Sequence, residues 1–194
     1  YMGWFTGTDN NSYTVRTGTP GVLENKRVLR ITAQEYKDGW NELYLNSKTL
    51  SENGISDTSA LKTVSFFVKT DNNMNALKLK LSDVKNDRKP YEAALITGRY
   101  YLLDTEKGCA TAEMLNDGYV NIPGGFTGYV VYDLESCDQS QVTALMSLGF
   151  ESMRLCFPSA SENELDTSWY FGELAVSEKD AVTFMADYTS VSAV

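Results

Sequence analysis

The residues of this chain that could do chemistry are aromatic rings, carboxylates and hydroxyls, because the chain contains no histidine. The absence of histidine excludes Ser–His–Asp and Cys–His catalysis, histidine-containing zinc sites and imidazole acid–base chemistry. Catalysis would have to use a pair of carboxylates, Lys, Tyr, Ser or an oxygen-ligated metal. The other chemistry open to the chain is recognition by aromatic rings, since it carries 3 Trp and 12 Tyr.

One aromatic segment combines a ring with short polar side chains. Trp40 follows Gly39, which predicts a turn from which the indole projects. The apolar face of a sugar ring packs on such a ring, and neighbouring polar groups bind the hydroxyls. The candidate sugar-binding residues are Trp40, Tyr44, Asn41, Asp38, Tyr36 and Trp169. For Trp40 and Trp169, packing in the core is the open alternative.

The acidic residues give weaker candidates. Glu164 and Asp166 resemble the start of the E-x-D-x-E strand of laminarinase-like glycoside hydrolases, but Ser168 stands where the third acid belongs. We therefore expect a solvated acidic loop and no catalytic residue. The one cofactor that the sequence suggests is a structural calcium ion, because loop carboxylates suit calcium. Its candidate ligands are Asp9, Glu24 and Glu173, which follow no EF-hand spacing.

Charge and glycine patterns exclude several classes of partner. The chain holds 17 Lys and Arg against 26 Asp and Glu, a net charge of −9. Nucleic acids and anionic membranes need clustered basic residues, so we expect neither as a partner. Gly124–Gly128 lacks the Lys of a phosphate-binding loop. No apolar run reaches the ~20 residues that a membrane-spanning helix needs.

The cysteines carry little information. Cys109, Cys137 and Cys156 show no C-x-x-C spacing, and three thiols cannot all pair within one chain. We expect free thiols, some of them packed as small apolar groups. A disulfide between Cys137 and Cys156 is the alternative.

Alternation of apolar and polar residues dominates the chain and predicts strands. The clearest case is Ala76–Asp83, where Leu77, Leu79 and Leu81 alternate with Lys78 and Lys80. Such a strand has one buried and one solvated face. Further strands are predicted at Arg27–Thr32, Asn41–Asn46, Thr63–Thr70, Arg99–Asp104, Tyr119–Ile122, Gly128–Leu134, Ser152–Phe157 and Trp169–Val176.

Helical spacing is rare. Ser140–Leu148 places Val142, Leu145 and Met146 on one side and predicts a helix, and Asp57–Leu61 predicts a short helical turn. With about nine to eleven strands, we expect a β-sandwich over residues 1–178. Residues 179–194 are expected to be a last strand or a linker, with Ala181–Tyr188 as the candidate strand.

The order of these segments resembles that of galactose-binding-like jelly-roll carbohydrate-binding modules of secreted clostridial and ruminococcal enzymes. The likeness runs from Gly21 to Val176 and includes Trp40–Leu45, Val64–Asp71 and the segment Tyr119–Tyr129 (YVNIPGGFTGY). The last of these is the most specific motif. The closing strand departs from the pattern, because Gly172–Glu173 replaces an Asp–Asp pair found near a structural calcium in similar modules.

The resemblance implies an all-β jelly-roll sandwich of two antiparallel sheets with at most one or two short helices. It also implies a non-catalytic module that binds a neutral plant polysaccharide, a β-glucan or another hemicellulose. Covalently linked catalytic or dockerin domains, as in a cellulosome, and a bacterial secreted or cell-surface location would follow, with this chain as a piece of a longer protein. The alternatives are a structural or adhesion module that binds protein, and a small jelly-roll hydrolase or lyase.

Overall fold

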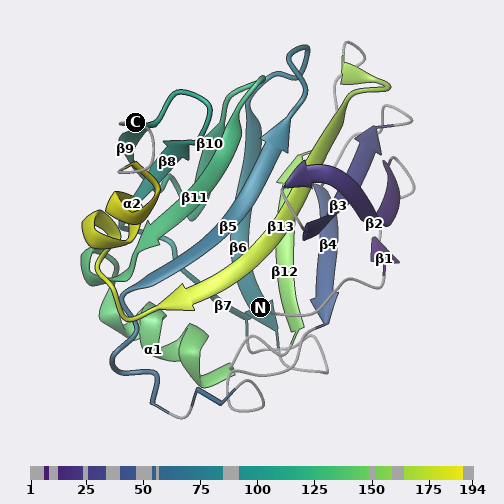
Figure 1. Cartoon of the computed structure of the whole chain (residues 1–194). Helices are drawn as coiled ribbons and strands as arrows, with labels where there is room; N and C mark the ends of the chain where they lie inside the picture. Colours follow the sequence, from purple (N-terminus) through teal and green to yellow (C-terminus); the bar gives the residue numbers. More distant parts are fainter. Residues whose placement is uncertain are drawn as a thin grey trace.

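The computed structural model describes residues 7–8, 13–23, 26–33, 40–46, 54–55, 57–84, 92–148, 152–158 and 164–189. Side chains are described for most positions within 28–33, 54–83, 93–148 and 164–188. In this part of the chain the strands form two antiparallel sheets that face each other (Figure 1). The predicted all-β sandwich is confirmed.

In the first sheet, sheet A, β6 pairs with three other strands. Its strand order is β1-β4-β12-β6-β10, and β7 also pairs with β6. The strands are β1 (Gly7–Thr8), β4 (Trp40–Asn46), β6 (Leu77–Val84), β7 (Glu92–Ala94), β10 (Tyr119–Ile122) and β12 (Ser152–Pro158).

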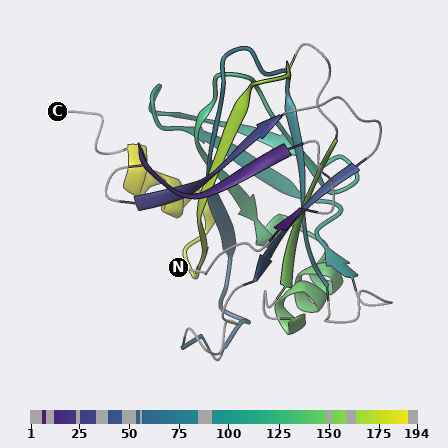
Figure 2. The same cartoon turned by 90° about the vertical axis from the view of Figure 1, so that its right-hand side faces the viewer.

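The second sheet, sheet B, packs against sheet A and has the order β2-β3-β13-β5-β11-β8-β9. The strands are β2 (Tyr13–Leu23), β3 (Lys26–Ala33), β5 (Thr63–Thr70), β8 (Arg99–Asp104), β9 (Cys109–Met114), β11 (Thr127–Asp133) and β13 (Ser168–Ser177). Figure 2 shows the two layers from the side, with one helix outside sheet B and the other at the lower end of the sandwich.

The main core lies between the sheets. Leu77, Leu79 and Leu81 of β6 are buried, while Lys78 is exposed and Lys80 is half-buried, as the alternation predicts. Sheet B contributes the other half of this core. Its fully buried members include Leu29, Ile31, Val64, Phe66, Val68, Val130, Tyr132, Trp169 and Phe171.

The outer face of sheet B carries a second apolar cluster, which α2 (Ala181–Thr189) covers. Ala181 and Met185 of the helix pack with Phe67, Tyr129 and other residues of the sheet. This is why β5 is buried on both faces. The prediction of a last strand or linker at Ala181–Tyr188 is wrong: apolar residues recur there at helical spacing. Asp180 also begins the helix by accepting from Thr183 N–H at 2.9 Å.

The other predicted helix is confirmed as α1 (Gln139–Leu148), which follows the short 3-10 helix η2 (Leu134–Ser136). Leu145 and Met146 are buried in the main core, and Val142 packs against it. Asp138 caps α1 by accepting from the Ser140 N–H at 2.8 Å and the Ser140 hydroxyl at 2.5 Å. These bonds lower the pKa of Asp138. The predicted helical turn at Asp57–Leu61 contains one turn bond, from Leu61 N–H to Thr58 O at 3.2 Å.

The motif Tyr119–Tyr129 is structural. Val120, Ile122 and Phe126 are buried in the main core. A Cβ atom on Gly124 would lie 1.9 Å from the carbonyl oxygen of Met74, so only glycine allows this close approach. The segment that best supports the family resemblance therefore specifies the packing of the sandwich.

Candidate functional site

Sheet A presents a polar outer face. Alternation places Lys78 and Lys80 of β6 on this face, and their register partners Asn121 and Tyr119 of β10 lie beside them. Lys78 and Asn121 are exposed, while Lys80 and Tyr119 are half-buried. Because α2 covers part of the outer face of sheet B, this face of sheet A is the better candidate for binding an extended ligand.

Strand register continues this face across the sheet. One row runs from Tyr119 through Lys80 and Cys156 to Glu42 on β4. Trp40 and Tyr44 lie at alternate positions to either side of Glu42, so they belong to the same side of β4. Two of the residues predicted for sugar binding thus share a sheet face with Lys80. Neighbouring strands are about 4.8 Å apart, so β4 and β6 are separated by about 10 Å.

The other residues predicted for sugar binding do not all lie on this face. Trp40 is the first residue of β4 and not part of a preceding loop. Asn41 alternates with Trp40 and takes the side shared with Leu43, so it does not group with Trp40 and Tyr44. Tyr36 and Asp38 lie outside the described residues.

The prediction for Trp169 is wrong. Its side chain is 0% exposed and contacts Phe171 edge-on, with ring centroids 6.4 Å apart. The indole is part of the main core between the sheets. An aromatic ring in that position has no face to offer a sugar.

On the outer face of sheet A, the Lys80 ammonium group lies over the ring of Tyr119. Its Nζ lies 5.5 Å from the centroid of the Tyr119 ring, within the range of a cation–π contact. Gly118 supports the Lys80 side chain, because a Cβ atom on Gly118 would lie 3.0 Å from Lys80 Cε. Gly118 also has φ +81°, a conformation that glycine adopts without strain. The sequence alone does not distinguish Lys80 and Tyr119, because a lysine in an alternating strand is typical of any solvated face.

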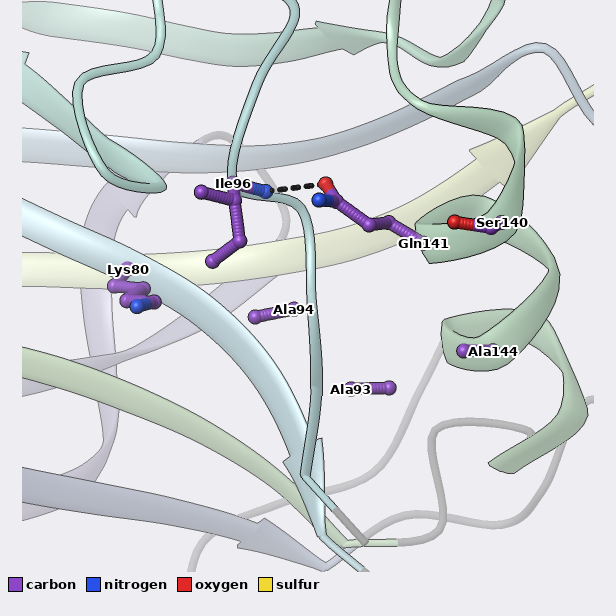
Figure 3. A pocket seen from close by; sticks show the side chains of 7 residues that line it. All are labelled: Lys80, Ala93, Ala94, Ile96, Ser140, Gln141 and Ala144. Carbon is purple, nitrogen blue, oxygen red and sulfur yellow. Dashed lines mark hydrogen bonds between the residues drawn. The ribbon is translucent and has the colours of Figure 1, made fainter.

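A cavity of about 450 Å³ opens beside Lys80, between sheet A and α1. Figure 3 shows Lys80 on one side of it and Ser140, Gln141 and Ala144 of α1 on the other, with Ala93, Ala94 and Ile96 completing the wall. Ile96 N–H donates to Gln141 Oε1 at 2.8 Å, which fixes the amide of Gln141 (Figure 3). The volume falls in the range of roughly 300–1,000 Å³ typical of small-molecule sites.

The acidic candidates form no catalytic pair in the described part of the chain. Glu164 is buried, and its Oε1 accepts from Asn75 N–H at 2.8 Å. Asp166 is exposed in a turn with φ 62°. The pair therefore lies in a turn before β13, and the expected solvated loop is only half right, because Glu164 links two chain segments.

Metal ligation is equally unsupported within the described residues, where no three Cys, Asp or Glu side chains cluster. Asp9 and Glu24 lie outside the described residues, and for Glu173 only the backbone position in β13 is described. Calcium binding by these residues stays a prediction.

The described thiols are free. Cys109 is exposed and Cys137 is buried, with its Sγ donating to Asp133 O at 3.3 Å. The alternative of a Cys137–Cys156 disulfide is therefore wrong. Burial raises the pKa of the Cys137 thiol to about 11.

The helices of the described chain, α1 and α2, have 10 and 9 residues. Neither is long and apolar enough to cross a membrane.

Comparison with known proteins gives structural neighbours only. No protein-family model matches the chain, and no curated protein matches it significantly. The structural neighbours include a family 30 carbohydrate-binding module of the cellulosomal cellulase Cel9D-Cel44B of Clostridium thermocellum. It is 14% identical over 92% of this chain and 92% of its own, with a TM-score of 0.45.

Two further neighbours are also bacterial carbohydrate-binding modules. The CBM22-1 xylan-binding domain of Paenibacillus barcinonensis Xyn10C is 14% identical over 90% of this chain and 86% of its own, with a TM-score of 0.38. The family 11 module of Clostridium thermocellum Lic26A-Cel5E is 8% identical over 89% of this chain and 86% of its own, with a TM-score of 0.41. The structural neighbours of this chain are thus clostridial and other bacterial carbohydrate-binding modules, at an identity and TM-score that assign no ligand to it.

Proposed function

We propose that the chain is a non-catalytic carbohydrate-binding module that binds a neutral plant cell-wall polysaccharide, a β-glucan or another hemicellulose. The observation that carries the proposal is the outer face of sheet A. Trp40 and Tyr44 share a side of β4 there, and the polar residues Lys78, Lys80 and Asn121 lie on the same face of β6 and β10.

This combination suits a polysaccharide for physical reasons. An aromatic ring packs on the C–H face of a pyranose, and exposed Asn and Lys side chains bind its hydroxyls. A face several strands wide offers these groups over a length that an extended chain of sugars can follow. A few such contacts support affinities between millimolar and micromolar, on the order of −4 to −8 kcal/mol.

In the parent protein, the module would hold a covalently attached catalytic domain at its substrate, outside the bacterial cell. Dockerin linkage and a structural calcium ion at Asp9, Glu24 or Glu173 belong to the same proposal. Glu164, the first acid of the hydrolase-like segment, accepts a hydrogen bond from the backbone N–H of Asn75, which supports a structural role for this carboxylate. Release of reducing sugar from a glycan panel would favour the hydrolase alternative instead.

Affinity electrophoresis against soluble β-glucans, xylans and mannans tests the proposal. We expect retardation by at least one polymer and a loss of about tenfold or more in affinity, about 1.4 kcal/mol, in Trp40→Ala. Tyr188→Ala is the matched control, because Tyr188 is an exposed aromatic residue on α2, at the other sheet. Failure to bind any glycan would favour the protein-binding alternative, and unchanged retardation of Trp40→Ala would remove Trp40 from the site.

A further inference from the structure

We infer that the cavity between sheet A and α1 is a subsite for a carboxylate-bearing sugar, a uronate branch on an otherwise neutral polysaccharide backbone. Lys80 and Gln141 supply the hydrogen-bond donors. The inference rests on the proposed function, because the branch would enter the cavity while its backbone lies along the outer face of sheet A.

The charge of Lys80 is not balanced by any carboxylate among the described side chains. In the described part of the chain, no carboxylate lies within ion-pair distance of its Nζ, and its contact is the Tyr119 ring. Two other lysines are paired in contrast, Lys107 with Asp104 at 2.8 Å and Lys62 with Glu135 at 3.2 Å. An oriented, half-buried ammonium group without a carboxylate is therefore available to an anionic ligand.

Gln141 faces Lys80 from the other side of the cavity (Figure 3). Its Oε1 accepts from Ile96 N–H, so the amide cannot turn over without losing this bond. The amide Nε2 is thereby left as a donor, with no acceptor among the described residues. Two donors on opposite walls suit a group that offers acceptors only, as a carboxylate does.

The acidic residue nearest to Gln141 in sequence, Asp138, already accepts hydrogen bonds. Asp138 accepts from Ser140 N–H and hydroxyl and lies at 3.4 Å from Gln141 N, and it does not line the cavity. Glu42 is in the same register row as Lys80, but it lies two strands away. The rest of the wall is mostly apolar and suits the C–H face of a sugar ring. It consists of Ala93, Ala94, Ile96 and Ala144, together with Ser140, whose hydroxyl donates to Asp138.

The test compares glucuronoxylan with the same polymer after chemical reduction of its carboxyl groups, measured by isothermal titration calorimetry. We expect the unmodified polymer to bind about fivefold more tightly than the reduced one at low salt, which is the scale of a partly exposed charge contact. Lys80→Met should abolish this difference, so that the two polymers bind with the same affinity. Gln141→Glu keeps the acceptor for Ile96 N–H but places a carboxylate in the cavity, so it should reverse the preference.

Lys78→Met is the matched control, because Lys78 lies on the same strand and face but does not line the cavity. It should retain the preference for the unmodified polymer. Circular dichroism of each variant establishes that it is folded. Equal binding of both polymers by the unaltered protein, or the same loss in Lys78→Met as in Lys80→Met, would overturn the uronate subsite and leave the proposed function standing. Binding of neither polymer, nor of any polymer in the glycan panel, would overturn both.

Discussion

The hydroxyl of Tyr100 accepts a hydrogen bond from the backbone N–H of Asn121 at 3.0 Å. Tyr100 belongs to β8 of sheet B, and Asn121 belongs to β10 at the edge of sheet A. The bond satisfies an N–H group of an edge strand and links the two sheets directly beneath the candidate binding face. It places a buried phenol in the core, and this burial raises the pKa of Tyr100.

Removing this hydroxyl should destabilise the sandwich. Tyr100→Phe leaves Asn121 N–H without its partner, and we expect the free energy of unfolding to fall by about 1 kcal/mol. Urea denaturation followed by fluorescence measures the change. Tyr101→Phe, on the adjacent half-buried residue of the same strand, should change stability by less than about 0.5 kcal/mol. Equal stability of Tyr100→Phe and the unaltered protein would contradict a structural role for the bond.

The close approach of β8 and β11 at Gly128 predicts that a larger residue there destabilises the protein. A Cβ atom on Gly128 would lie 1.9 Å from the carbonyl oxygen of Leu103 in the neighbouring strand β8. In Gly128→Ala the strands must move apart, at a cost of about 1–3 kcal/mol. The midpoint of thermal unfolding should fall accordingly. An unchanged midpoint would show that β8 and β11 tolerate the methyl group.

The helix α2 should contribute stability without affecting glycan binding. Met185 is buried against the outer face of sheet B, so Met185→Ala should cost about 2 kcal/mol or more. Val182→Ala, at a residue that is 66% exposed on the same helix, should cost less than about 0.5 kcal/mol. Chemical denaturation gives both values. Weaker glycan binding by folded Met185→Ala would indicate that the binding site lies on sheet B and not on sheet A.

The cysteines should differ in reactivity. Thiolate is the reactive form, and a pKa of about 11 leaves about one Cys137 in a thousand ionised at pH 8. Ellman's reagent should therefore modify exposed Cys109 rapidly and leave Cys137 unmodified in the folded protein. Cys109→Ser should remove about one rapidly reacting equivalent, and Cys137→Ser should remove none. The opposite pattern would show that Cys137 is accessible.

Local patterns predicted most of the sandwich. Strong alternation of apolar and polar residues predicted β6, and the helical spacing of Val142, Leu145 and Met146 predicted α1. The strand β9 was missed because all six of its residues are exposed, so it has no buried side to set a period. For α2 the prediction of a strand or linker is wrong, although its apolar residues are spaced as in a helix.

The candidate site was less predictable, because it depends on distant residues that the fold brings together. Trp169 has the same side chain as Trp40, and only the strand register shows that it is in the core. Lys80 has the sequence context of an ordinary solvated lysine. Its role is suggested by Tyr119 of the neighbouring strand and Gln141 of α1, which no spacing in the sequence connects to it.

The most direct test of the account is a titration of the ¹⁵N-labelled protein with cellohexaose and xylohexaose, followed by amide chemical shifts. If the outer face of sheet A binds the glycan, the largest shifts should occur at Lys78, Lys80, Tyr119 and Asn121, with those of α2 unchanged. Saturable shifts confined to α2 and the outer face of sheet B, or no shifts with any oligosaccharide of the panel, would contradict it.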